Sequence, residues 1–176
     1  MKTNYVQKEY YELQKQSQKW IWYLMLFLLL LNVWAIIQQV IFNIPFGNIP
    51  APNWVLFVAL GVLAMFWSLL IFSKLETKIN EKGVWFRYHP FHLRYCCIEW
   101  NEIDKAYVRL YRPMKEYGGW GMRTAFNGDN GKAYNVAGNI GLQLELKNGS
   151  KVLIGTAQGV EMREFLQMSQ FNTAKS

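Results

Sequence analysis

Two histidines and two cysteines are the first candidates for chemistry, because His89, His92, Cys96 and Cys97 carry the nitrogen and sulfur ligands that zinc prefers. The two cysteines are adjacent, however, and neighbouring residues of a strand point to opposite faces, so they are poorly placed to bind one ion. The sequence contains no further histidine or cysteine that could complete a tetrahedral set. We therefore predict turn or interface histidines, free thiols, and neither a metal site nor a cofactor.

The glycine-rich segment 118–121 (Gly-Gly-Trp-Gly) is the second candidate, as a phosphate-binding loop. A P-loop requires Gly-x-x-x-x-Gly-Lys followed by Ser or Thr, which this sequence lacks. The glycines instead predict tight turns, bulges or close backbone approach. No Ser-His-Asp set, carboxylate pair or nucleotide fingerprint is recognisable either. The sequence therefore predicts a protein that is not an enzyme; the alternative is an enzyme with an unrecognised, metal-dependent site.

A basic and aromatic group in the second half of the chain is the best candidate for a binding surface. Cations and aromatic rings favour the lipid headgroup layer, protein interfaces and stacked nucleic acid. An anchored position disfavours nucleic acid, so a protein partner and anionic lipid headgroups stay open. The alternative is the half-exposed outer face of an ordinary strand. The group comprises Tyr107, Arg109, Tyr111, Arg112, Lys115, Trp120 and Arg123, with Tyr117 among them.

The elements that must position this group begin with a long uncharged segment, residues 20–72. All 19 basic and all 12 acidic residues lie outside it. Two apolar runs within it, Trp20–Phe42 and Trp54–Phe72, are long enough as helices to cross a hydrocarbon core of about 30 Å. The prolines and the glycine of residues 43–53 break the helix between them. The sequence thus predicts a transmembrane helical hairpin in contact with the lipid bilayer.

The distribution of basic residues predicts the orientation of the hairpin. Lysines precede the first run and follow the second, whereas the connecting loop 43–53 has none. Because basic residues stay on the cytoplasmic side, we expect a multi-pass protein of the cell (inner) membrane with both termini in the cytoplasm. Uncharged amides and hydroxyls inside a span usually bond a neighbouring helix, here within the hairpin or in a homo-oligomer. These intramembrane residues are Asn32, Gln38, Gln39 and Ser68.

Residues outside the hairpin predict a short arm and a strand-rich domain. Residues 1–19 contain no helix breaker and are expected to continue the first span as a cytoplasmic helix. From residue 73 onward, short β-branched and aromatic runs alternate with turns, which predicts about seven antiparallel strands. The domains are therefore expected at residues 1–19, 20–72 and 73–176.

The C-terminal part of the chain has the clearest local signals. Leucines alternate with polar residues over 142–146, and Asn148-Gly149 predicts a two-residue turn that would place Leu144 opposite Leu153. A helical spacing follows and predicts an amphipathic helix that closes the open end of a small barrel. That helix carries Met162, Phe165, Leu166 and Ser169 on its apolar side.

This order of elements resembles the bacterial pleckstrin-homology-like (PH-like) membrane proteins that have two N-terminal transmembrane helices. The resemblance implies an α+β fold: a helical hairpin, then an antiparallel β-barrel or split barrel capped by a C-terminal helix. Lipid-binding eukaryotic members carry a basic cluster in the first strand hairpin, whereas this chain has mixed charge there. The similar strings are Lys82-Gly83-Val84-Trp85-Phe86, Ile98-Glu99-Trp100-Asn101-Glu102-Ile103, residues 117–123, residues 141–146 and residues 151–156.

The sequence as a whole favours a membrane-anchored, non-enzymatic module. Such a module would present a protein-binding or headgroup-binding surface at the cytoplasmic leaflet. The net charge of +7 fits a position beside anionic lipids. The alternative is a structural subunit of a larger membrane complex, assembled through the hairpin itself.

Overall fold

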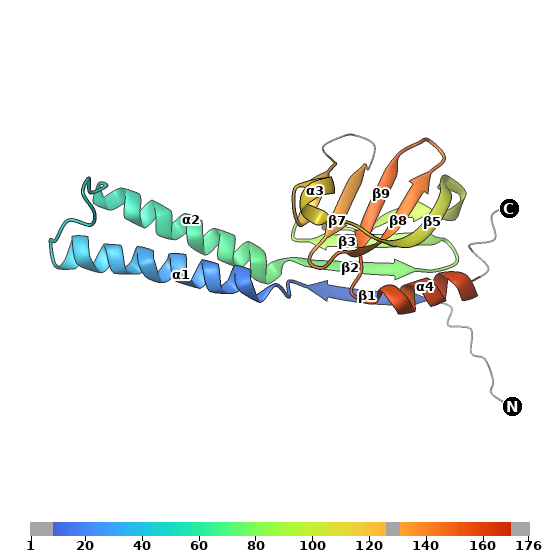
Figure 1. The fold of residues 1–176 in the computed structure, drawn as a ribbon, viewed down its shortest axis with the longest axis horizontal. Helices are drawn as coiled ribbons and strands as arrows, with labels where there is room; N and C mark the ends of the chain where they lie inside the picture. The colour runs from blue at the N-terminus through green and yellow to red at the C-terminus, as the bar shows by residue number, and fades with distance from the viewer. Residues whose placement is uncertain (1–8, 126–130, 170–176) are drawn as a thin grey trace, which may run out of the picture. The chain divides into compact units, whose positions relative to one another are not determined.

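The computed structural model describes residues 9–125 and 131–169 (Figure 1). The chain divides into two compact units. One unit, Ser17–Phe72, is helical and is called the helical unit below. The other joins the residues before that segment to the residues after it, and is called the strand unit. The helical unit is therefore an insertion in the sequence of the strand unit.

The helical unit consists of two apolar helices. Helix α1 (Lys19–Ile36) continues into one π-helical segment, η1 (Ile37–Ile41), and α2 (Asn53–Phe72) follows the proline-containing loop. Both helices are long and apolar enough to cross a membrane, and their bounds agree with the predicted spans to within one residue. Ala35 is the one buried side chain of α1, and α2 has none. Their large apolar side chains are therefore exposed or half-buried, whereas a helix in the core of a soluble protein buries its apolar side chains.

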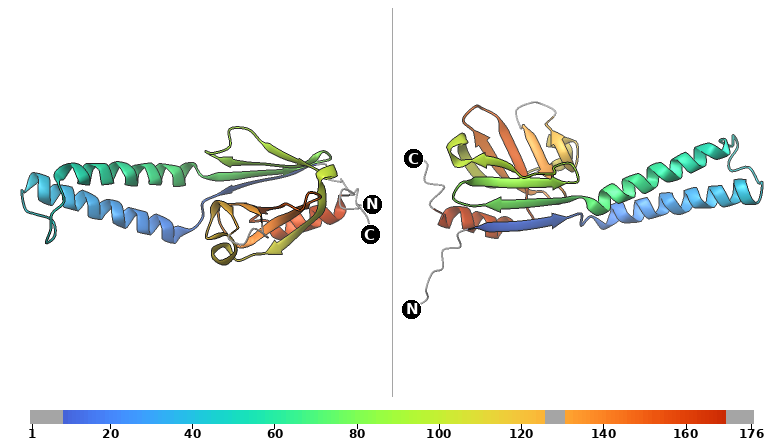
Figure 2. Two further views of the ribbon diagram at one scale, coloured as in Figure 1. Left: turned by 90° about the horizontal axis from the view of Figure 1, so that it is seen from above. Right: turned by 180° about the vertical axis from the view of Figure 1, so that it is seen from behind.

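The strand unit contains two sheets, which Figure 2 shows from two further sides. Sheet A is antiparallel in the order β1-β2-β3-β4, and sheet B has the order β5-β8-β9-β7-β6 with one parallel pair, β7–β9. Sheet A comprises β1 (Tyr10–Lys15), β2 (Lys74–Ile79), β3 (Gly83–His89) and β4 (Cys96–Glu99). Sheet B comprises β5 (Ile103–Leu110), β6 (Gly121–Thr124), β7 (Lys132–Asn135), β8 (Ile140–Leu146) and β9 (Lys151–Gly155).

Three short helices complete the strand unit. The 3₁₀ turn η2 (Trp100–Glu102) links the sheets, α3 (Pro113–Tyr117) follows β5, and α4 (Gly159–Met168) ends the described chain. The predicted amphipathic helix is confirmed, because the apolar side of α4 joins side chains of both sheets in one core. The α+β class is likewise confirmed. The prediction was an antiparallel barrel or split barrel, and neither sheet closes into a barrel among the described strands.

The prediction of a helical N-terminal arm is wrong, because Tyr10–Lys15 is strand β1. This strand pairs with β2 along its whole length, from Tyr10 opposite Ile79 to Lys15 opposite Lys74. Its buried residues alternate strictly, but two of the three are the polar Glu12 and Gln14. A strand that turns polar groups inward has no hydrophobic period of two, which is why its sequence did not reveal it. The described part of this arm is therefore not a separate helical domain, and residues 1–8 of the predicted domain lie outside the described residues.

The hairpin predicted around Asn148-Gly149 is present between β8 and β9, but its register differs. Leu144 lies opposite Val152, and Gln143 lies opposite Leu153. The Leu146 N–H donates to the Ser150 carbonyl, which closes a loop longer than two residues. Leu153 therefore packs on the other face of sheet B, in a second apolar cluster beneath α3.

Candidate functional site

The predicted basic and aromatic group does not form one surface. Tyr111 is only 3% exposed and packs edge-on against Tyr117, with 6.1 Å between the ring centroids. Both rings belong to the apolar cluster between α3 and sheet B. Burial raises the pKa of Tyr111 to about 12. Tyr111 is therefore a structural residue, and its assignment to a binding surface is wrong.

Two further members of the group, both on β5, are engaged by acidic neighbours on α3 and β8. The Arg109 guanidinium donates to Glu116 at 2.8 Å and to the Gln143 carbonyl oxygen at 3.0 Å. The Tyr107 hydroxyl donates to Glu145 at 2.8 Å. Burial would raise the pKa of Glu116, but the hydrogen bonds from the Arg109 side chain and the Arg112 N–H, together with the charges of both arginines, outweigh it and lower that pKa. Arg109 is thus neutralised by a carboxylate that stays ionised at neutral pH.

The remaining members lie together on α3 and at the start of β6, and we call them the cationic ridge: Arg112, Lys115, Trp120 and Arg123. The three cations are exposed and form no ion pair in the part of the chain that the structure describes. The Trp120 indole donates to the Gly138 carbonyl at 2.9 Å, and the Arg123 side chain donates to the Trp120 carbonyl at 3.2 Å. The ridge is consequently ordered, while its charges are available to an anionic ligand.

The local sequence explains how α3 presents the ridge. Pro113 occupies the first turn of α3, where a missing N–H costs nothing. Gly118 ends the helix in the left-handed conformation at φ 71°, which a glycine adopts without strain. The Glu116 carboxylate accepts the backbone N–H of Arg112 at 2.7 Å. The short helix is therefore held at both ends.

The ridge lies at one particular end of the strand unit, which we call the linked end. There β1 ends at Lys15 and β2 begins at Lys74, and these two residues are register partners. Tyr88 pairs with Leu75 next to that end, and a Cβ on Gly121 would lie 3.9 Å from its hydroxyl. Figures 1 and 2 accordingly show α3 at the end of the strand unit where β2 begins. Both chain connections to the helical unit leave from this end.

A second cluster, on the outer face of sheet A, surrounds Glu76. This carboxylate is 5% exposed. Its oxygens accept from Arg87 at 2.7 Å and from the Tyr95 hydroxyl at 2.5 Å, and Lys74 lies at 3.3 Å. Burial alone would raise the pKa of Glu76, but the hydrogen bonds from Tyr95, Arg87 and Lys74 hold it at about 2. Because Glu76 stays ionised at neutral pH, it cannot act there as a general acid.

The sequence did not reveal this cluster, because its members come from four separate segments: β1, β2, β3 and the loop that precedes β4. Lys78 lies over the rings of Tyr11 and Tyr95, at 5.4 and 5.2 Å from their centroids. Burial and the hydrogen bond to Glu76 raise the pKa of Tyr95 to about 12. Burial, assisted by the charges of Arg87 and Lys74, lowers the pKa of His89, so this imidazole is neutral at pH 7. The cluster holds the outer face of sheet A together.

The four candidate metal ligands are separated by the fold. His92 Nδ1 lies 3.8 Å from the Cys96 sulfur, whereas His89 lies beside Glu76 on the outer face of sheet A. Cys97 is register partner to Trp85, and Cys96 to Phe86, so the two thiols alternate across β4. Within residues 9–125 and 131–169, no three His, Cys, Asp or Glu side chains are grouped to hold a metal ion.

Glu12 is the second polar site that the sequence did not reveal. Its side chain is nearly inaccessible and accepts four hydrogen bonds, and it forms no ion pair with a described basic residue. Two donors belong to β1 itself, and two belong to the junction between β9 and α4. The donors are the Tyr10 hydroxyl at 2.8 Å, the Gln14 amide at 3.0 Å, the Thr156 hydroxyl at 2.6 Å and the Ala157 N–H at 2.7 Å.

The polar residues of the helical unit make local contacts. Gln39 donates to the Ala51 carbonyl at 2.6 Å and to the Asn53 side chain at 2.7 Å. Ser68 donates to the Met65 carbonyl of its own helix, so the expected pairing of Ser68 with an amide of the first span is not observed. Asn32 Oδ1 is buried and has no hydrogen-bond partner among the described residues. The Gln38 backbone carbonyl accepts the Ile44 N–H at 3.0 Å.

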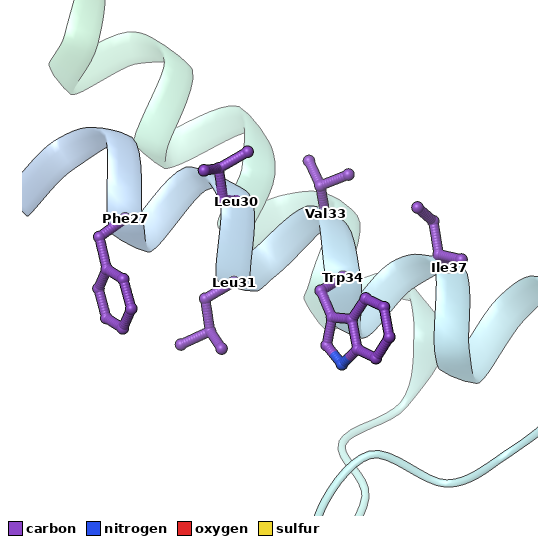
Figure 3. A pocket seen from close by; sticks show the side chains of 6 residues that line it. All are labelled: Phe27, Leu30, Leu31, Val33, Trp34 and Ile37. Carbon is purple, nitrogen blue, oxygen red and sulfur yellow. The ribbon is translucent and has the colours of Figure 1, made fainter.

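Helix α1 also carries an open apolar groove of about 450 Å³ (Figure 3). The indole nitrogen of Trp34 is the one polar side-chain atom among its lining residues. Such a groove offers no group for catalysis or for recognition of a polar ligand. It is lined by Phe27, Leu30, Leu31, Val33, Trp34 and Ile37.

The sequence matches no protein-family model and no curated protein. Its function must therefore be argued from its own residues.

Proposed function

We propose that the protein is a membrane-anchored, non-enzymatic module of PH-like architecture whose strand unit contacts anionic lipid headgroups at the cytoplasmic leaflet. The observation that carries this proposal is the cationic ridge: three exposed cations at the linked end that form no ion pair among the described residues. In the proposal, α1 with η1 and α2 cross the bilayer, both termini are cytoplasmic, and each connection returns the chain to the linked end at the headgroup layer.

The lengths of the chain connections support this placement of the ridge. Helix α2 has 20 residues, or about 30 Å, which matches the hydrocarbon thickness. Ser73 alone separates α2 from β2, so Lys74 lies within about 7 Å of the end of α2. The headgroup layer is roughly 5–7 Å thick on each side. The linked end therefore starts at the depth of the lipid phosphates.

Charge complementarity supports headgroups as the ligand. Each basic residue near an anionic leaflet contributes about 1 kcal/mol of attraction. The half-exposed Trp120 beside these cations is also typical of the membrane interface. An acidic protein surface is the competing ligand, and the experiment below separates the two.

The test uses the full chain in lipid nanodiscs and measures amide hydrogen exchange over residues 110–125. We expect slower exchange in phosphatidylglycerol discs than in phosphatidylcholine discs. The triple variant Arg112→Gln, Lys115→Gln and Arg123→Gln should abolish this difference. A matched control removes three exposed cations distant from the linked end and should retain it: Lys82→Gln, Lys147→Gln and Arg163→Gln. Equal exchange of the wild-type protein in both lipids would refute headgroup binding.

A second candidate function, a structural subunit assembled through the hairpin, is favoured by Asn32. Its buried Oδ1 has no partner in the described residues, and an amide in hydrocarbon is normally satisfied by a neighbouring helix. Disulfide crosslinking of Asn32→Cys in native membranes tests this idea, with exposed Phe57→Cys on α2 as the control. Dimers formed from position 32 but not from position 57 would support assembly through this face of α1.

A further inference from the structure

The loop between β3 and β4, residues 90–95, carries two large apolar side chains that the described residues leave largely exposed. Leu93 is 86% exposed and Phe91 is 57% exposed. Arg94 follows them and is exposed as well. Leaving such side chains in water is unfavourable, and adjacent exposed apolar residues commonly mark an interaction site.

The loop is held in this conformation by its own contacts. The His92 N–H donates to the Tyr88 carbonyl at 2.8 Å, and the His92 ring packs inward against Tyr134 at 5.4 Å. The Phe91 ring stacks on buried Tyr88, at 6.1 Å and 25°. Because His92 points inward, its neighbours Phe91 and Leu93 are exposed on either side. A rigid loop loses little conformational entropy when it binds.

The loop leaves sheet A at the linked end. His89, the last residue of β3, is register partner to Lys74, the first residue of β2. Figures 1 and 2 show the green β3–β4 connection at the same end of the strand unit as α3. Exposed Met114 on α3 borders Gly119 together with the Arg123 guanidinium, so apolar and cationic side chains are interleaved at this end.

We infer that residues 90–95 form a membrane wedge, in which Phe91 and Leu93 insert at the boundary between headgroups and acyl chains of the leaflet that holds α2. Arg94 would lie at the level of the phosphates. We choose lipid as the partner of the loop because the strand ends beside it lead directly into the apolar helices. The inference rests on the proposed function in one respect, since both place the linked end at the membrane. It adds an apolar contact that does not depend on lipid charge.

The experiment places a photoreactive side chain in the wedge of the full-length protein. Phe91 is replaced by p-benzoylphenylalanine, which keeps an aromatic ring and inserts into nearby C–H bonds. Leu93 is replaced in a second variant, in case the stacking on Tyr88 is needed for folding. The control carries the same probe at exposed Lys82, in the turn at the opposite end of sheet A. Each protein is irradiated in phosphatidylcholine nanodiscs and in phosphatidylglycerol nanodiscs, and lipid–peptide adducts are counted by mass spectrometry.

We expect at least about fivefold more lipid adducts from positions 91 and 93 than from position 82 in both lipids, because burial of apolar side chains needs no anionic headgroup. Adduct yields no higher than at position 82 would overturn the wedge, and so would crosslinks to protein in place of lipid. Adducts that form only in the anionic lipid would also overturn it, while leaving the electrostatic headgroup contact intact. Conversely, lipid adducts in both lipids would support the wedge even if amide exchange at the cationic ridge were the same in both kinds of nanodisc.

Discussion

Replacement of Glu12 by alanine should detach strand β1 from the strand unit. The side chain is buried and accepts from donors on both sides of the contact between β1 and the β9–α4 junction. The Tyr10 hydroxyl and the Gln14 amide have second acceptors, namely Gln158 and the Gly155 carbonyl. The Thr156 hydroxyl and the Ala157 N–H have no second acceptor among the described residues, so both lose their acceptor.

The expected loss follows from these two orphaned donors. A buried donor without an acceptor costs about 1–3 kcal/mol, and bonds to a charged group lie toward the upper end. Two such donors give a destabilisation of about 3 kcal/mol, since the other two donors keep a partner. For a unit of this size that corresponds to a fall in Tm of about 10 °C. Local opening of β1 should accelerate amide exchange in β1 and β2 by about a hundredfold.

The assay is hydrogen exchange and thermal unfolding of the full chain in nanodiscs, with two further variants. Exposed Glu9→Ala removes a carboxylate just before β1 and should change neither measurement. Glu12→Gln keeps the shape of the side chain but replaces one accepting oxygen by an NH₂ donor that faces other donors. Its Tm and exchange rate should therefore lie between those of Glu9→Ala and Glu12→Ala. If Glu12→Ala exchanged and melted like Glu9→Ala, the carboxylate would not hold β1 in place and the reasoning would be refuted.

Three further predictions concern stability. The pKa of Glu76 is about 2, below its ordinary 4.5, so its ion pairs stabilise the fold above pH 4.5 and lose about 3 kcal/mol as pH falls to 2. Denaturant unfolding should show this loss, and Glu76→Gln should flatten it. Gly131→Ala, at φ 67°, would drive a Cβ into the backbone of β9 and should lower the free energy of unfolding by about 2–3 kcal/mol. The Cβ of Gly149→Ala meets no atom, so this variant should lose about 1 kcal/mol. Tyr111→Ala should cost about 3 kcal/mol and Trp120→Ala under about 1, by thermal unfolding.

Each of these has a clear contrary result. An unchanged acid transition in Glu76→Gln would show that its hydrogen bonds do not control acid stability. Equal losses from the two glycine variants would show that the close approach to β9 is relieved without cost. A Trp120 variant as unstable as the Tyr111 variant would place Trp120 in the core and remove it from the cationic ridge.

Elements with a strong hydrophobic period could be predicted from the sequence. The two apolar helices, the strands around Asn148-Gly149 and the amphipathic α4 all follow from such periods. Strand β1 could not be predicted in this way, because its inward positions include the polar residues Glu12 and Gln14. Glu12 accepts from Ala157 and Gln14 donates to Gly155, both more than 140 positions away in the sequence. The register of the β8–β9 hairpin also escaped prediction, since a longer loop moved Val152 into the position expected for Leu153.

The candidate site was predicted in part. The sequence identified the segment of the cationic ridge, because cations and aromatic rings are concentrated there. It could not separate exposed Arg112 from buried Tyr111, because the apolar cluster beneath α3 depends on contacts with β7 and β9. The Glu76 cluster and the exposed loop carrying Phe91 and Leu93 were missed, since neither has a recognisable sequence motif.

The sequence by itself determined the chemical character of this protein: an uncharged pair of helices, a basic strand-rich remainder, and a ridge of cations and aromatic rings. These properties are local, because they depend on residue type and on spacing along the chain. Only the tertiary structure decided that β1 belongs to the strand unit, which makes the helices an insertion between two paired strands. It also decided which cations lack acidic partners and which apolar residues stay exposed. Those outcomes depend on strand pairing between distant segments, and pairing is specified by hydrogen bonds and packing that no single segment contains.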